Sequence, residues 1–126
     1  MKTFLAMSLL LLSSASQADV IKCVFTEPFI NTTYNMANST LTYKDYNGTE
    51  STVIKNVSFQ IQSAGVFRLV AKHGKVLQTL LLNHQGSDGM SDVTYPFSVK
   101  DYSPFMTANR GWGGCDSQLL KRTKEM

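Results

Sequence analysis

The chain is poor in the residues from which catalytic and metal centres are usually built. Its 126 residues include two cysteines, two histidines and one tryptophan, and 17% of the residues are charged. The two histidines, His73 and His84, lack the close spacing of a zinc-binding pair. No Gly-x-Ser-x-Gly sequence is present to place a nucleophilic serine on a strand-to-helix turn. The sequence therefore predicts no enzyme, no metal centre and no cofactor.

A clustered positive charge is missing as well. The net charge is +3, but the segment from Asp19 to Leu120 holds eight basic and eight acidic residues. The remaining basic residues lie at Lys2 and in the last six positions. Nucleic-acid binding depends on a concentrated positive surface that displaces counterions. The charge distribution therefore argues against a nucleic-acid partner.

The only long apolar run lies at the N-terminus. Phe4–Leu12 follows Lys2 and precedes a stretch of small residues that ends at Ala18. This order of charge, apolar core and small residues is typical of a secretory signal peptide. The run is too short to span a bilayer, which takes about 20 apolar residues. We expect cleavage after Ala18, leaving residues 19–126 as a single β-domain in the periplasm or outside the cell.

Only two cysteines are available for a disulfide in that exported domain, Cys23 and Cys115. An oxidising compartment favours their pairing. The chain-entropy model gives a stabilisation of about 4–5 kcal/mol for a loop of this size. The bond would place the first and last strands side by side, with their Cα atoms about 5–6 Å apart.

Alternation of apolar and polar residues, the period of a half-buried strand, dominates the domain. Strands are expected at 20–26, 30–34, 41–43, 53–61, 66–72, 76–83, 94–100 and 111–115, and Ser117–Lys124 could add a short terminal helix. Asn47-Gly48 and His73-Gly74 supply turns between them. Seven or eight short strands, with the first and last joined by a disulfide, predict a small antiparallel up-and-down β-barrel. Side chains would fill its interior, so function is expected on the loops or the outer face.

Two segments carry a resemblance to a known family. The sequence TEPFI at 26–30 is followed by STLTY at 39–43, and SDGMSDVTYPF at 87–97 is followed by Gly111–Cys115. Together they resemble an uncharacterised family of bacterial envelope proteins with TEPFW, SDGMSD and C-terminal GC motifs. Some members are joined to small domains similar to lysozyme inhibitors. The resemblance implies an exported β-domain of bacterial origin and implies no activity.

Two positions depart from the family pattern. Ile30 replaces the aromatic residue after TEPF, and Gly86 stands where the family has a cysteine before SDGMSD. The family's usual disulfide within the C-terminal half is therefore not available. Cys23 could serve as the replacement partner of Cys115.

The loop from Ser87 to Asp92 allows three interpretations. Asp88 and Asp92 could cap backbone amides around a turn at Gly89. The turn could instead present Met90 to a partner. The two carboxylates could also gather oxygens around a calcium ion, although the longer acidic series of an EF-hand is missing.

Trp112 lies among glycines just before Cys115 and allows two interpretations. It could pack over the disulfide, with the glycines making room, which is the interpretation the sequence favours. It could also form an exposed platform for a partner, with Arg110 beside it. Arg110 and Lys100 are the basic residues nearest to this region and are candidate partner contacts.

These observations predict a non-enzymatic binding module of the cell envelope. Its most concrete form is an inhibitor of lysozyme or another wall hydrolase. The alternative is a β-barrel that binds a small ligand or calcium. Catalysis by Glu27 lacks a second carboxylate in a fixed relation to it.

Overall fold

The computed structural model describes residues 19–25, 30–45, 48–104, 106, 111–117 and 123–124. These residues form strands and turns and contain no helix. The strands are β1 (Val20–Phe25), β2 (Ile30–Asn35), β3 (Thr40–Asp45), β4 (Ser51–Ile54), β5 (Ser58–Ser63), β6 (Val66–Val70), β7 (Val76–Gly86), β8 (Val93–Asp101), β9 (Trp112–Ser117) and β10 (Thr123–Lys124). The predicted all-β class is confirmed. The proposed signal peptide, residues 1–18, lies outside the described residues.

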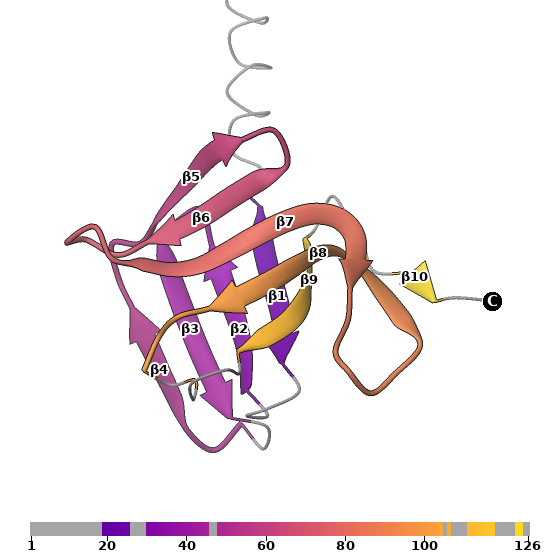
Figure 1. The fold of residues 1–126 in the computed structure, drawn as a ribbon. Coiled ribbons are helices and arrows are strands. Elements are labelled where there is room, and N and C mark those ends of the chain that lie inside the picture. Colours follow the sequence, from indigo (N-terminus) through magenta and orange to yellow (C-terminus); the bar gives the residue numbers. More distant parts are fainter. Residues whose placement is uncertain are drawn as a thin grey trace, which may run out of the picture.

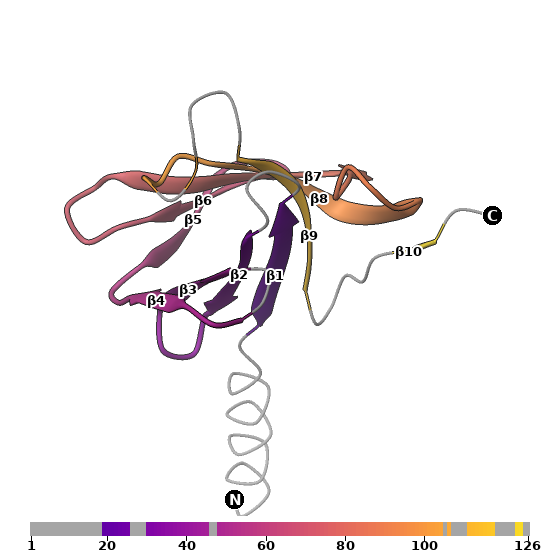
Figure 2. The same cartoon turned by 90° about the horizontal axis from the view of Figure 1, so that it is seen from below.

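Nine strands form one continuous antiparallel sheet in the order β4-β3-β2-β1-β9-β8-β7-β6-β5. Two meanders, β1–β4 and β5–β9, meet where β1 pairs with β9. Figure 2 shows the sheet folded at this seam, with β1–β4 below and β5–β8 above. The strands of the two halves cross steeply in Figure 1. The core lies between the halves, so each strand has one inner and one outer face.

The sheet does not close into a barrel, and this corrects the sequence-based prediction. Within the described residues, β4 and β5 are its two edges and do not pair with each other. The predicted strand 53–61 is in fact two strands, separated at Lys55–Val57. Asn56 adopts a φ of 60° there, a left-handed conformation that asparagine tolerates better than most residues. At this break the chain passes from β4, in one half of the sheet, to β5, in the other half.

The short segment that connects the two edge strands, β4 and β5, is anchored in the core. The Val57 side chain is fully buried, and its N–H donates to the Ser39 carbonyl at 2.9 Å. Its carbonyl accepts a hydrogen bond of 2.7 Å from the Tyr34 hydroxyl. Val57 therefore fills the end of the open sheet, which explains how an unclosed sheet keeps a packed interior.

The disulfide between Cys23 and Cys115 is present, as predicted, and lies on the seam. The two cysteines are direct cross-strand partners on β1 and β9, and both are buried. Their Cα atoms are 4.0 Å apart, closer than the predicted 5–6 Å. The directly opposed register brings the two Cα atoms together, since facing residues of the closer type of antiparallel pair are usually only about 4.5 Å apart.

The C-terminal helix is the second prediction that requires correction. Ser117 belongs to β9, and Thr123 and Lys124 form β10, which pairs with β8 opposite Thr94 and Val93. Residues 118–122 lie outside the described part of the chain. Among the residues described, no helix is long and apolar enough to cross a membrane.

Candidate partner-binding face

Trp112 lies on the outer face of the sheet, where 61% of its surface is exposed. It opens β9 three residues before Cys115, and an odd spacing along a strand puts two side chains on opposite faces. The cysteine points into the core, so the tryptophan points out. The interpretation in which Trp112 packs over the disulfide is therefore wrong.

The glycines beside Trp112 make room for other groups. A Cβ at Gly113 would collide with the carbonyl oxygen of Val24 on the neighbouring strand. A Cβ at Gly114 would come within 2.7 Å of the Tyr95 ring. The glycines thus let β9 approach β1 and let Tyr95 lie against the sheet.

A row of cross-strand neighbours runs across the outer face and ends at Trp112. The pairing register places Gln60 opposite Arg68, Arg68 opposite Thr79, Thr79 opposite Lys100 and Lys100 opposite Trp112. Facing residues of antiparallel strands lie on the same side of the sheet, so the row is continuous. The Lys100 Nζ lies 4.7 Å from the centre of the Trp112 ring, a cation–π contact.

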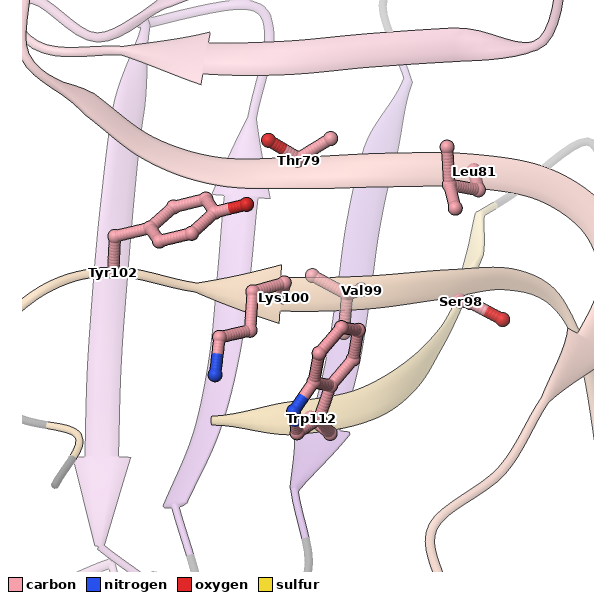
Figure 3. Close-up of a pocket in the computed structure, with 7 residues that line it drawn as sticks. All are labelled: Thr79, Leu81, Ser98, Val99, Lys100, Tyr102 and Trp112. Carbon is pink, nitrogen blue, oxygen red and sulfur yellow. The ribbon is translucent and has the colours of Figure 1, made fainter. Parts of the chain in front are cut away.

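A shallow hollow of about 100 Å³ adjoins this row. It is lined by Thr79, Leu81, Ser98, Val99, Lys100, Tyr102 and Trp112, which Figure 3 labels. Tyr102 and Leu81 are 50% and 39% exposed, so the hollow has apolar and aromatic walls. It is much smaller than a typical ligand pocket of about 300–1,000 Å³. It suits a single inserted side chain or sugar ring. We call Arg68, Lys100, Tyr102 and Trp112 the platform.

The charge of the platform is positive. Arg68 and Lys100 contribute two cations to the row, and none of its members is acidic. Asp101 follows Lys100 directly but is 98% buried on the inner face. The Nε of Arg68 is buried and has no hydrogen-bond partner among the described residues. The platform is therefore electrostatically suited to a negatively charged partner.

The Ser87–Asp92 loop is organised around one carboxylate. Asp88 Oδ1 accepts hydrogen bonds from the Met90 and Ser91 amides at 2.9 and 2.8 Å, and Oδ2 accepts one from the Ser91 hydroxyl at 2.7 Å. These bonds, with the Ser91 amide contributing most, lower the pKa of Asp88 to about 2. Gly89 has a φ of 77°, which a turn of this kind requires. This geometry agrees with the amide-capping interpretation.

The carboxylate of Asp88, on which the calcium interpretation depends, is engaged by the loop itself. Both oxygens of Asp88 already accept hydrogen bonds from loop donors. In the described part of the chain, no three histidine, cysteine, aspartate or glutamate side chains are grouped as a metal ion would need. Calcium usually takes six to eight oxygen ligands.

The predicted partner contacts are only partly brought together. Lys100 and Trp112 touch, whereas Met90, 64% exposed, and Asp92, also exposed, lie on the loop and line neither hollow beside Trp112. A second hollow connects Ser87 and Gly89 of that loop with Trp112. Arg110 and Glu27 lie outside the described residues.

Sequence reasoning missed a buried polar cluster that joins the two halves of the sheet. Asp101 Oδ2 accepts hydrogen bonds from the Tyr43 hydroxyl at 2.7 Å and the Gln78 amide at 2.9 Å. The same Gln78 nitrogen donates to Thr32 Oγ1 at 3.1 Å. Burial raises the pKa of Tyr43 well above its usual value, and the charge of Asp101 acts in the same direction. The sequence contains a signal for the burial of Asp101, because Asp101 continues the alternation that points Phe97 and Val99 inward.

The cluster is enclosed rather than open to a substrate. Thr32, Gln78 and Asp101 are each at least 98% buried. Oδ2 of the Asp101 carboxylate accepts the hydrogen bonds of the cluster, and Oδ1 accepts one from the Ser103 N–H at 2.8 Å. Both oxygens are therefore hydrogen-bonded inside the core, as a buried polar group requires. Its evident role is to fix how the two halves pack.

Comparisons with protein-family models, with curated proteins and with solved structures find no match to this chain.

Proposed function

We propose that the chain is a non-enzymatic binding module of the cell envelope that recognises its partner through the platform. The observation that carries this proposal is the exposed Trp112 with Lys100 held against its ring. Tryptophan and arginine are the residues most enriched among those that dominate binding energy at protein interfaces. An exposed tryptophan at the end of a cationic row fits such a role better than a structural one.

The partner that the platform fits best is a wall hydrolase. Glycoside hydrolases hold a pair of carboxylates in a cleft shaped for sugar rings. Arg68 and Lys100 would pair with those carboxylates, and Trp112 would occupy a sugar-binding position. The Ser87–Asp92 loop adjoins the platform and would contact the rim of the cleft through Met90. In this form the module inhibits lysozyme or a similar enzyme.

Export to an oxidising compartment belongs to the same proposal. The Cys23–Cys115 disulfide is compatible with the periplasm or the extracellular space, where such bonds persist. Wall hydrolases act in those compartments, so the module and its partner would meet there.

A lysis assay tests the proposal. Purified chain is added to several lysozymes and wall hydrolases acting on cell-wall suspensions, and we expect inhibition at micromolar concentration. Trp112→Ala should raise the half-inhibitory concentration about 30-fold, as expected for loss of about 2 kcal/mol at an interface anchor. Lys100→Glu should raise it about tenfold, because it places a negative charge against the cleft carboxylates.

Lys75→Glu is the matched control. Lys75 is an exposed lysine in the β6–β7 turn, away from the row, so the same charge reversal should leave inhibition unchanged. Absence of inhibition by the folded chain against every hydrolase would overturn the hydrolase form. Equal effects of Lys75→Glu and Lys100→Glu would overturn the placement of the site on the platform.

The single tryptophan gives a direct binding signal. Trp112 is the only tryptophan in the chain, so its fluorescence reports on the platform alone. We expect emission typical of a water-exposed indole in the free protein and a blue shift when the partner covers it. Binding that leaves the emission and its quenching by iodide unchanged would mean that the partner contacts another face.

A further inference from the structure

The two edges of the open sheet are not equally protected. Edge strands expose unpaired N–H and C=O groups, and natural proteins usually shorten them or place charged residues or proline on them. β4 has four residues and lies between Glu50 and Lys55. β5 has six residues, SFQIQS, with no charge and no proline. The β5 edge therefore lacks the charge and the proline that usually prevent pairing, and its one irregularity lies at its end, between Ile61 and Ser63.

The β5 strand is also exposed and firmly held. Ile61 is 70% exposed, more than any other large apolar side chain among the described residues. Phe59 stacks on Phe67 with ring centres 5.3 Å apart, and Phe67 makes an edge contact with Phe97 at 6.0 Å. These aromatic contacts fix β5 to the core while its outer edge stays unpaired within the described residues. A rigid, uncharged edge is a suitable template for another strand.

We propose that β5 pairs antiparallel with β5 of a second copy of this chain, so that the two sheets continue into one. Pairing centred on Gln60 places Phe59 of each copy opposite Ile61 of the other, on the inner face. Gln60 then faces Gln60 of the second copy on the outer face. A two-fold axis makes such an interface self-complementary.

A second copy fits this edge because every facing pair is free of charge. The apolar residues Phe59 and Ile61 meet each other, and glutamine amides can donate to and accept from one another. The balanced charge of residues 19–120 adds little long-range repulsion between copies. The irregularity between Ile61 and Ser63 limits the straight ladder to the first part of β5, which the pairing uses.

Sedimentation equilibrium of the chain produced in cells tests this, from low micromolar to near-millimolar concentration. We expect a monomer–dimer equilibrium. Ile61→Lys should raise the dissociation constant of the dimer about tenfold or more. The substitution replaces the exposed isoleucine of each copy by a lysine, which puts two like charges beside the two-fold axis. Val53→Lys is the matched control: Val53 is 51% exposed on the opposite edge, β4, and its exchange should leave the equilibrium unchanged.

Hydrogen exchange adds a readout that does not depend on the variants. Backbone amides of β5 should exchange more slowly at high than at low protein concentration, and those of β4 should not change. A monomer at every concentration would overturn the proposal. A dimer that Ile61→Lys leaves intact, or that Val53→Lys weakens equally, would overturn the assignment to β5. The result is independent of hydrolase inhibition, since β5 contributes no residue to the platform.

Discussion

At the scale of single residues, spacing along a strand decides which side chains are available for function. Trp112 and Cys115 are three positions apart, and the buried disulfide fixes the inward face of β9. That parity alone would have predicted the exposed tryptophan. The glycine-rich surroundings instead favoured a buried one, although those glycines accommodate Val24 and Tyr95.

Asp88 and Asp92 look equivalent in sequence but differ in the structure. Asp88 accepts most of the side-chain hydrogen bonds described for the loop, the Ser87 and Ser91 hydroxyls accept the others, and none described involves Asp92. We expect Asp88→Ala to reduce the free energy of unfolding by about 1–2 kcal/mol, because two backbone amides lose their acceptor. Asp92→Ala should stay within about 0.5 kcal/mol. Thermal denaturation of both variants at neutral pH measures the difference.

The contribution of Asp88 should depend on pH in a defined direction. Its pKa is lowered to about 2 in the folded chain, against about 3.9 for an unfolded aspartate. The stabilisation is therefore complete above about pH 5 and is lost as the pH falls towards 2. The melting-temperature difference between wild type and Asp88→Ala should shrink over this interval. A calcium-dependent rise of the wild-type melting temperature would instead indicate a metal site.

At the scale of elements, alternation predicted most strands but not where one strand becomes two. The inward residues Ile21, Cys23 and Phe25 of β1 follow directly from the period of two. The break at Asn56 could not be predicted in the same way, because Val53 and Ile54 join Phe59 in one apparent run. Its cause is a contact distant in sequence, the anchoring of Val57 by Tyr34 and Ser39. Because the break separates β4 from β5, these two strands become the unpaired edges of an open sheet.

The close approach of β9 to β1 depends on the absence of a side chain at Gly113. We expect Gly113→Ala to lower the free energy of unfolding by about 3 kcal/mol, because its Cβ would collide with the backbone of Val24. Gly74→Ala is the control: Gly74 has a φ of 90° but open space around it. It should cost only about 1 kcal/mol of backbone strain. Chemical denaturation of both variants distinguishes packing from conformational strain, and equal losses would contradict the packing explanation.

At the scale of the whole molecule, three features add to the β1–β9 pairing in holding the two halves of the sheet together. The disulfide joins them at the seam, the Asp101 cluster joins β3 to β8 across the core, and Val57 fills the open end. The disulfide was predictable from two cysteines and the expected export. The other two features were not, because they depend on which strands face each other across a fold that sequence alternation does not specify.

Removing the disulfide should cost a large part of the stability. We expect Cys23→Ala with Cys115→Ala to lower the free energy of unfolding by about 4–5 kcal/mol, since the bond spans 92 positions and restricts the unfolded chain. Reducing agent should lower the melting temperature of wild type and leave that of the double variant unchanged. A loss below about 1 kcal/mol would show that the remaining contacts hold the seam without the bond.

The position of the disulfide also determines how the chain carries mechanical load. Cys23 and Cys115 lie near the two ends of the described domain and face each other on neighbouring strands. A pulling force applied between the ends would therefore travel through the sulfur atoms and bypass the segment between them. Arg68, Lys100, Tyr102 and Trp112 all belong to that bypassed segment, so they would keep their places while the two ends of the domain are pulled apart.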